Sequence, residues 1–152
     1  MNVNHSIKHM GIALLTASVL GLGVPSVTQA APITDFNTLT QHEVEQSYYH
    51  DWNRNPKFRA SVRQLFARSN VPMPAWVRHG AGPSAPSRVL PQEGVNWVLL
   101  NTCKMHNCGD NHLIILFNPP TREIYGLAQL NKKTVWLGKP NDAQKELLKT
   151  KK

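Results

Sequence analysis

The sequence predicts an α+β fold, an antiparallel β-sheet meander of about five strands with two to three helices packed on it. Helical signals occur early in the segment after residue 30 and again at its end, whereas strand-like apolar runs fill residues 88–138. The connections between these runs have hairpin length, which pairs consecutive strands antiparallel. Because the first two helices precede all the strands, we expect the helices on one face of the sheet.

The first 30 residues have the pattern of a secretory signal peptide. Lys8 supplies positive charge, an apolar stretch follows roughly from Met10 to Val24, and Ala30 ends a short run suited to cleavage. The apolar stretch is short for a membrane span, although an uncleaved signal anchor is the alternative. We therefore expect cleavage after Ala30, a bacterial periplasmic location, and one domain over residues 31–152.

The segment after the predicted signal is basic. Residues 31–152 contain 16 lysines and arginines against 9 aspartates and glutamates, a formal charge of +7. Such a surface favours anionic partners, namely wall polymers, acidic proteins or nucleic acid. Export argues against nucleic acid, and no second long apolar run indicates a membrane protein. A basic protein without any charge-driven partner is the alternative.

Two helices are predicted before the strands. A capping box at Thr40–Glu43 begins a helix that reaches about Trp52. Asn55-Pro56 begins a second helix, with Asn as the cap and Pro in the first turn, and Ser69-Asn70 ends it. The apolar stripe of this second helix consists of Phe58, Val62, Leu65 and Phe66.

An extended segment and a run of strands follow. Two prolines in Val71–Val77 exclude a helix, so we expect extended chain with Trp76 filling the core, then a loop over Gly80–Ser87. Gly126 indicates a bulge. Asn141 caps a last helix over Asp142–Lys149. The predicted strands are Arg88–Leu90, Val95–Thr102, His112–Phe117, Glu123–Leu130 and Thr134–Gly138.

The most distinctive motif is the six-residue loop Cys103-Lys104-Met105-His106-Asn107-Cys108, which contains the only two cysteines. In an exported protein these two are expected to pair. A ring of this size stabilises the fold by about 2 kcal/mol. It also restrains Lys104 and His106, both of which can donate hydrogen bonds to carboxylates. This suits insertion into another molecule's cleft; the alternative is a ring that only staples a hairpin end, with His106 idle.

This loop resembles the cysteine-bracketed loop of the inhibitor of vertebrate lysozyme (Ivy) family, whose usual form is CKPHDC. About thirty residues upstream, Met73-Pro74-Ala75-Trp76-Val77 resembles the LPAWV segment of that family. The order of the predicted elements agrees as well, and the likeness spans roughly Asn55 to Trp136. Two positions depart from the pattern, since Met105 replaces a proline and Asn107 replaces an aspartate.

The resemblance implies a periplasmic, often homodimeric inhibitor with an antiparallel sheet, no catalytic activity and no cofactor or metal. In the family the loop enters the lysozyme cleft and its histidine hydrogen-bonds the catalytic carboxylates. That role would fall to His106, with Cys103 and Cys108 as the disulfide brace and Lys104 as a neighbour. Such a cleft holds one ionised carboxylate and one acid with a raised pKa.

Charge bears on the identity of the target. Animal lysozymes are commonly basic, and like charges slow encounter and weaken binding. The resemblance therefore leaves two classes of partner, a less basic lysozyme or one of the bacterium's own lytic transglycosylases.

Three other functions compete with inhibition. A thiol redox enzyme usually has Cys-x-x-Cys rather than this wider spacing. Cys103, His106, Cys108 and His112 could bind zinc or copper if the cysteines were reduced. A non-catalytic binder of cell-wall polymer would use the basic surface. His50 beside Asp51 is weak evidence for a catalytic dyad, since such a pair is more often a solvated helix end. No pair of acids has a spacing that supports glycoside hydrolysis.

Overall fold

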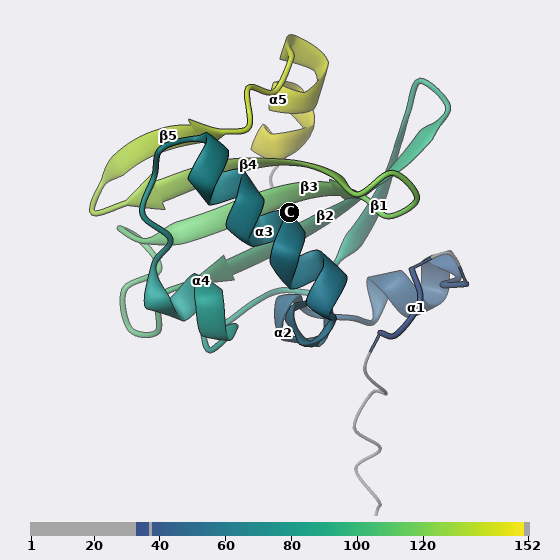
Figure 1. Cartoon of the computed structure of the whole chain (residues 1–152), viewed down its shortest axis with the longest axis horizontal. Helices are drawn as coiled ribbons and strands as arrows, with labels where there is room; N and C mark the ends of the chain where they lie inside the picture. Colours follow the sequence, from purple (N-terminus) through teal and green to yellow (C-terminus); the bar gives the residue numbers. More distant parts are fainter. Residues whose placement is uncertain (1–32, 37, 151–152) are drawn as a thin grey trace, which may run out of the picture.

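The computed structural model describes residues 33–36 and 38–150, so the predicted signal peptide lies outside the described residues. Five strands form one antiparallel sheet in chain order (Figure 1). This confirms the predicted meander and the α+β class. The strands are β1 (Arg88–Gln92), β2 (Val95–Cys103), β3 (His112–Asn118), β4 (Glu123–Leu130) and β5 (Lys133–Leu137).

Five helices accompany the sheet: α1 (Gln41–Glu45), α2 (Tyr49–Arg54), α3 (Pro56–Arg68), α4 (Ala75–His79) and α5 (Asp142–Lys149). Helix α3 crosses one face of the sheet, whereas α5 packs on the other (Figure 1). The expectation that the helices share one face is therefore wrong for α5. No helix in the described part of the chain is long and apolar enough to cross a membrane.

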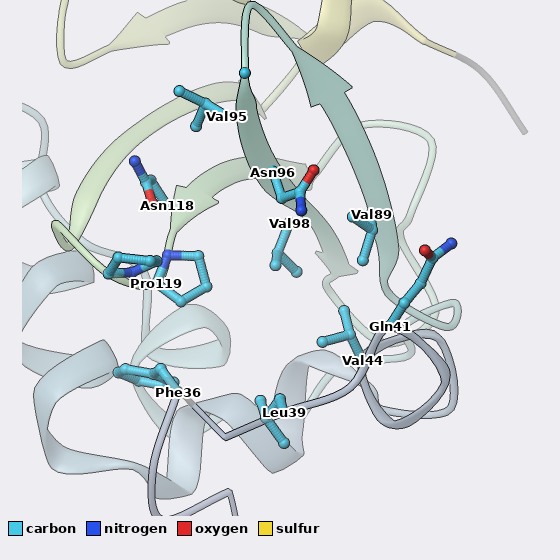
Figure 2. A pocket seen from close by; sticks show the side chains of 12 residues that line it. Phe36, Leu39, Gln41, Val44, Val89, Val95, Asn96, Val98, Asn118 and Pro119 are labelled. Atoms are coloured by element: carbon cyan, nitrogen blue, oxygen red, sulfur yellow. The ribbon is translucent and has the colours of Figure 1, made fainter.

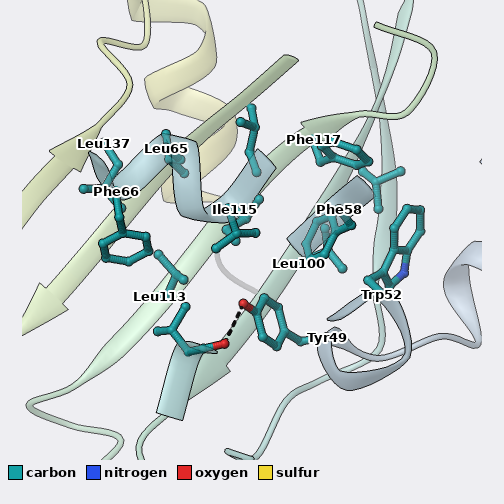
Figure 3. Close-up of a cluster of buried hydrophobic side chains, with 14 of the residues drawn as sticks. Tyr49, Trp52, Phe58, Leu65, Phe66, Leu100, Leu113, Ile115, Phe117 and Leu137 are labelled. Carbon is teal, nitrogen blue, oxygen red and sulfur yellow. Dashed lines mark hydrogen bonds between the residues drawn. The ribbon is translucent and has the colours of Figure 1, made fainter. Parts of the chain in front are cut away.

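The larger core lies between the sheet and α2 and α3 (Figure 3). Rings of Trp52, Phe58 and Phe117 pack edge to face with centroids 5.1–5.9 Å apart, an arrangement that aromatic pairs prefer. The Tyr49 hydroxyl donates a hydrogen bond of 3.1 Å to the Val77 carbonyl, and burial raises the pKa of Tyr49 above its ordinary value. This bond fastens α4 to the core.

A smaller core lies on the opposite face. It joins Trp97 and Leu99 of β2 and Leu116 of β3 to Leu148 of α5. Alternate residues of β3 thus enter different cores, and both faces of this central strand are apolar. Because both faces of β3 are apolar, α5 covers the face that α2 and α3 leave open.

The helix predicted from Thr40 to Trp52 is interrupted. The capping box at Thr40 is present, but α1 ends at Glu45. Asp51 Oδ2 then accepts the Tyr48 backbone N–H at 2.9 Å and begins α2. The Ser47 hydroxyl accepts the indole N–H of Trp52 at 2.7 Å, which holds the chain in the break. The Asn55 cap of α3 and the Asn141 cap of α5 are confirmed.

Two further expectations were wrong. Residues 75–79 form α4 instead of extended chain, because Pro74 occupies the N-cap, where its missing N–H costs nothing. Trp76 only borders the core, and Val77 is the buried residue of this helix. Gly126 marks no bulge, since the ladders of β4 with β3 and with β5 run without interruption. A side chain there would crowd Leu137.

The loop over Gly80–Ser87, which the sequence predicts correctly, runs beside the end of β2. Pro83 O accepts the Cys103 N–H at 3.0 Å, and the Asn101 side chain accepts the Ala85 N–H at 2.8 Å. Gly82 approaches so closely that an added Cβ would lie 1.8 Å from Cys103 O. Glycine is therefore required where this connector meets the cysteine loop.

We predict that Gly82→Ala displaces the base of the cysteine loop and lowers the free energy of unfolding by at least about 2 kcal/mol, because backbone must move to admit the methyl group. Urea unfolding measures this loss. The matched control is Gly109→Ala, whose added Cβ meets nothing within 4 Å. Equal stability of the two variants would show that the close contact is not a constraint.

Candidate functional site: a disulfide-braced loop

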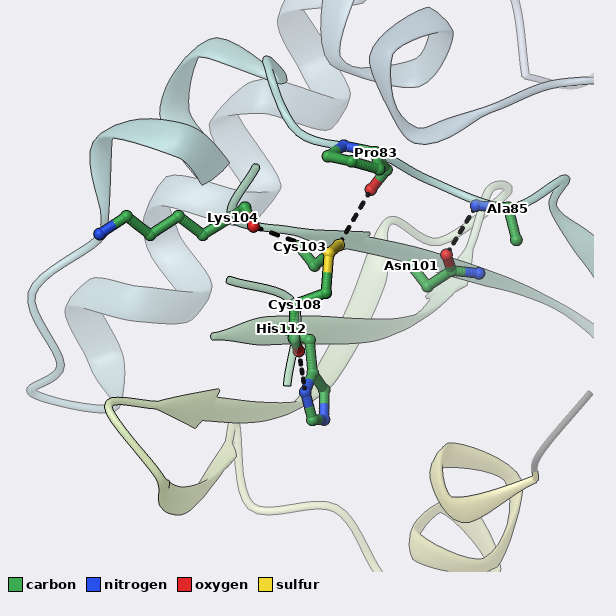
Figure 4. Close-up of a disulfide and its surroundings, with 7 residues drawn as sticks. All are labelled: Pro83, Ala85, Asn101, Cys103, Lys104, Cys108 and His112. Atoms are coloured by element: carbon green, nitrogen blue, oxygen red, sulfur yellow. Dashed lines mark hydrogen bonds between the residues drawn. A yellow bond between two sulfur atoms is a disulfide. The ribbon is translucent and has the colours of Figure 1, made fainter. Parts of the chain in front are cut away.

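The predicted cysteine loop connects β2 to β3, and Cys103 and Cys108 form a disulfide with their Cα atoms 4.9 Å apart (Figure 4). Both sulfurs are therefore engaged, which removes the two thiolates from the alternative metal site with His106 and His112. No group of three or more metal-ligating side chains occurs among residues 33–36 and 38–150. The Cys-x-x-x-x-Cys pair closes a hairpin end within an antiparallel sheet.

The ring contains a tight turn. The Asn107 N–H donates a hydrogen bond of 2.9 Å to the Lys104 carbonyl, which closes a β-turn over Lys104–Asn107. Of the two central residues only His106 has a positive φ, 61°. Those signs are the ones of a type II turn, whose third position favours glycine and whose second position favours proline. The histidine thus stands in a left-handed conformation, and Met105 occupies the position where proline fits.

The tip of this turn faces solvent. Lys104 and His106 are exposed, and Met105 has 54% of its surface exposed. In Figure 4 the Lys104 side chain extends away from the disulfide. The His106 ring forms no hydrogen bond, ion pair or ring contact with another described residue. Its nitrogens are consequently available to a partner without breaking any internal bond.

The segment that follows the cysteine loop, residues 109–111, is held from the side by the end of β4 and the β4–β5 turn. Asp110 O accepts the Lys132 N–H at 3.1 Å, Asn111 Oδ1 accepts the Asn131 N–H at 3.1 Å, and Gly109 O accepts the Gln129 side chain at 2.9 Å. The sequence analysis missed these contacts. No local signal could have revealed them, because the partners lie about twenty residues apart in the chain.

Two backbone hydrogen bonds also close the base of the loop. Lys104 N–H donates to Asn111 O at 3.0 Å, and Asn111 N–H donates to Asn107 O at 3.1 Å. The His112 ring lies 3.2 Å from the Cys108 carbonyl (Figure 4). His112 therefore supports the base of the loop, whereas His106 stands at its tip.

The weak dyad candidate has a structural explanation. His50 Nε2 lies 3.2 Å from Asp51 Oδ1, and the second oxygen of Asp51 accepts the Tyr48 N–H. The pair lies at the start of α2, where His50 is exposed and Asp51 is buried, so the expected helix end is solvated only at the histidine. The carboxylate serves as the N-terminal cap of α2.

A groove of about 470 Å³ lies at the opposite end of the sheet from the loop, between Phe36, residues 39–44 and the β1–β2 and β3–β4 turns (Figure 2). Apolar side chains and amides line it, among them Phe36, Leu39, Asn96, Val98 and Asn118. None of the lining residues is charged. The groove therefore supplies neither a carboxylate pair for glycoside hydrolysis nor a metal-ligand set.

Comparison with known proteins identifies the family of this chain. The family model described as inhibitor of vertebrate lysozyme (Ivy) matches residues 57–152. A Pseudomonas aeruginosa protein named inhibitor of vertebrate lysozyme is 39% identical over 72 residues, 47% of this chain and 46% of that protein. An uncharacterised Yersinia pestis protein is 24% identical over 131 residues, 78% of each chain. The chain thus spans about half the length of the Pseudomonas relative.

The family model covers more than half of the chain, and the matched segment includes the disulfide loop and all five strands. The protein belongs to the inhibitor of vertebrate lysozyme (Ivy) family, a family of inhibitors and not of enzymes.

Proposed function

We propose that the protein is a periplasmic lysozyme inhibitor that fills the active-site cleft of its target with the disulfide-braced loop and its His106. The observation that carries the proposal is the combination of restraint and exposure in this loop. The disulfide and the Lys104–Asn107 turn fix the backbone, while the side chains at the tip are solvent-exposed.

The proposed mechanism is competitive occlusion. A lysozyme cleft presents two carboxylates, and an imidazole inserted between them can donate to the ionised one and block entry of the sugar. Because the loop is ordered before contact, binding costs little conformational entropy. Lys104 adds a cationic donor beside the histidine. No bond is made or broken, so the protein needs no catalytic residue.

A second candidate target is a lytic transglycosylase of the same cell, whose cleft also binds cell-wall glycan. The basic charge of residues 31–152 favours an acidic partner over the commonly basic animal lysozymes. A homodimer is consistent with either target and stays a prediction. A wall-lysis assay against chicken-type lysozyme, goose-type lysozyme and lytic transglycosylase distinguishes the targets, and a protein that inhibits none of them would not have the proposed function.

We predict that His106→Ala weakens inhibition at least tenfold and lowers the melting temperature only slightly, because the exposed ring makes no internal hydrogen bond although alanine tolerates the positive φ less well than histidine. His106→Asn is a second variant, since Asn tolerates the left-handed conformation and lacks the imidazole. The control is His42→Ala, another exposed histidine. Inhibition constants from wall-lysis assays report the effect, and two loop variants that inhibit like the parent would exclude His106 as the key residue.

We predict that Met105→Pro strengthens inhibition by about two- to fivefold, because proline suits the second position of the turn and narrows the ensemble of the free loop. Met105→Ala is the control for the lost thioether. The ratio of the two inhibition constants is the measurement. A proline variant that inhibits no better than the alanine variant would argue against turn restraint as a source of affinity.

A further inference from the structure

The turns at the two ends of the sheet carry charge of opposite sign, whereas Arg54 of α2 and Arg59 and Arg63 of α3 are exposed elsewhere on the surface. We call one end the loop end, which comprises the disulfide loop, the β4–β5 turn and α4 with its connector. We call the other the far end, which comprises α1, the β1–β2 turn and the β3–β4 turn (Figure 1). The sheet separates these two sets of turns by the length of its strands.

The loop end is cationic. Lys104 in the loop, Lys132 and Lys133 in the β4–β5 turn, and Arg78 in α4 are all exposed. Within residues 75–87, 103–111 and 131–133 the one acidic residue is Asp110, which is partly buried. Because the Lys132 N–H donates a hydrogen bond to Asp110 O, the β4–β5 turn with its lysines lies directly against the disulfide loop.

The far end holds most of the exposed acids. Glu43 and Glu45 lie on α1, Glu93 lies in the β1–β2 turn, and Glu123 begins β4. Hydrogen bonds from the backbone N–H and hydroxyl of Thr40 lower the pKa of the Glu43 carboxyl, which keeps this residue ionised. Lys57 and Arg122 are two cations beside these acids, and both line one hollow with Asp35.

The remaining acids do not alter this division. Asp51 is buried beside His50. Asp142 and Glu146 on α5 form ion pairs with Lys145 at 3.0 Å and Lys149 at 2.9 Å, so that helix presents matched charges. The molecule therefore has a positive end that carries the inhibitory loop and a more acidic end that faces away from it.

We infer that this charge separation steers the loop end toward its target, and that the partner is a glycan-cleaving enzyme whose cleft has an acidic rim. The inference rests on the proposed function and adds Lys132 and Lys133 as specificity-determining residues beside the loop. Charges at the rim of an interface act mainly on the association rate, and salt screens their effect. A fixed pair of lysines next to the inserting loop would meet that rim before the loop enters.

The test compares two charge reversals of equal size. Lys132→Glu/Lys133→Glu alters the loop end, and Lys57→Glu/Arg122→Glu makes the same change at the far end. Each pair includes one residue with a positive φ, Lys132 or Arg122, so the backbone demands are matched. Lys132→Gln/Lys133→Gln provides a milder variant should the reversal destabilise the fold.

Stopped-flow association with an acidic chicken-type lysozyme and with a basic one, at low and at physiological ionic strength, gives the rates. We expect the loop-end reversal to slow association with the acidic enzyme about tenfold at low salt, with little change in dissociation and with much of the difference lost when salt is raised. The far-end reversal should change the rate less than about twofold, since its charges lie away from the contact.

The outcomes separate the two claims. Equal rates for both reversals, in a protein that still inhibits, would overturn the steering inference and leave the inhibitor function standing. Loss of binding to purified cell-wall sacculi, with unchanged association to the enzyme, would assign the lysines to wall polymer instead and also overturn it. A parent protein that inhibits no lysozyme or transglycosylase would overturn both claims.

Discussion

The disulfide between Cys103 and Cys108 is the constraint on which the proposed function of this fold depends. It converts the β2–β3 connection from an ordinary hairpin end into a closed ring with a single tight turn at its tip. The rest of the molecule holds that ring in place. The Gly80–Ser87 connector packs against one side of its base, and the β4–β5 turn is hydrogen-bonded to the other.

The scaffold suits this task because its central strands are buried on both faces. β3 contributes alternate residues to two cores, one under α2 and α3 and one under α5. A strand packed on both faces provides a close-packed, poorly compressible base for the loop that precedes it. The restrained loop can then bind with a small loss of conformational entropy, which is how an inhibitor with a short contact region gains affinity.

Much of the fold could be predicted from local sequence signals. The caps at Thr40, Asn55 and Asn141 and the meander of strands are encoded by short patterns, and the structure contains them. The errors arose where distant contacts decide. The helix break at Ser47 involves Ser87, forty residues away, whose N–H and hydroxyl both donate to the Ser47 carbonyl. The second-face position of α5 depends on the apolar residues of β3. The expectation that the prolines of Val71–Val77 exclude a helix was wrong at α4, because Pro74 precedes the helix and does not interrupt it.

The candidate site shows the same division. The cysteine spacing and the exposed histidine were accessible to sequence reasoning, and the family match supports the interpretation. The roles of Gly82 and of the lysine pair Lys132 and Lys133 could not be predicted from the sequence, since each depends on which segments the sheet brings together at one end. Neither Gly82 nor the lysine pair lies in a local motif that marks it as part of a site.

The most direct test of the central claim is the inhibition constant of Cys103→Ser/Cys108→Ser, measured beside its melting curve. We predict that the double variant keeps the folded sheet and loses at most about 2 kcal/mol of stability, while inhibition of the susceptible lysozyme or transglycosylase weakens tenfold or more. Undiminished inhibition by the open loop would contradict the account, because the ring would then contribute stability alone.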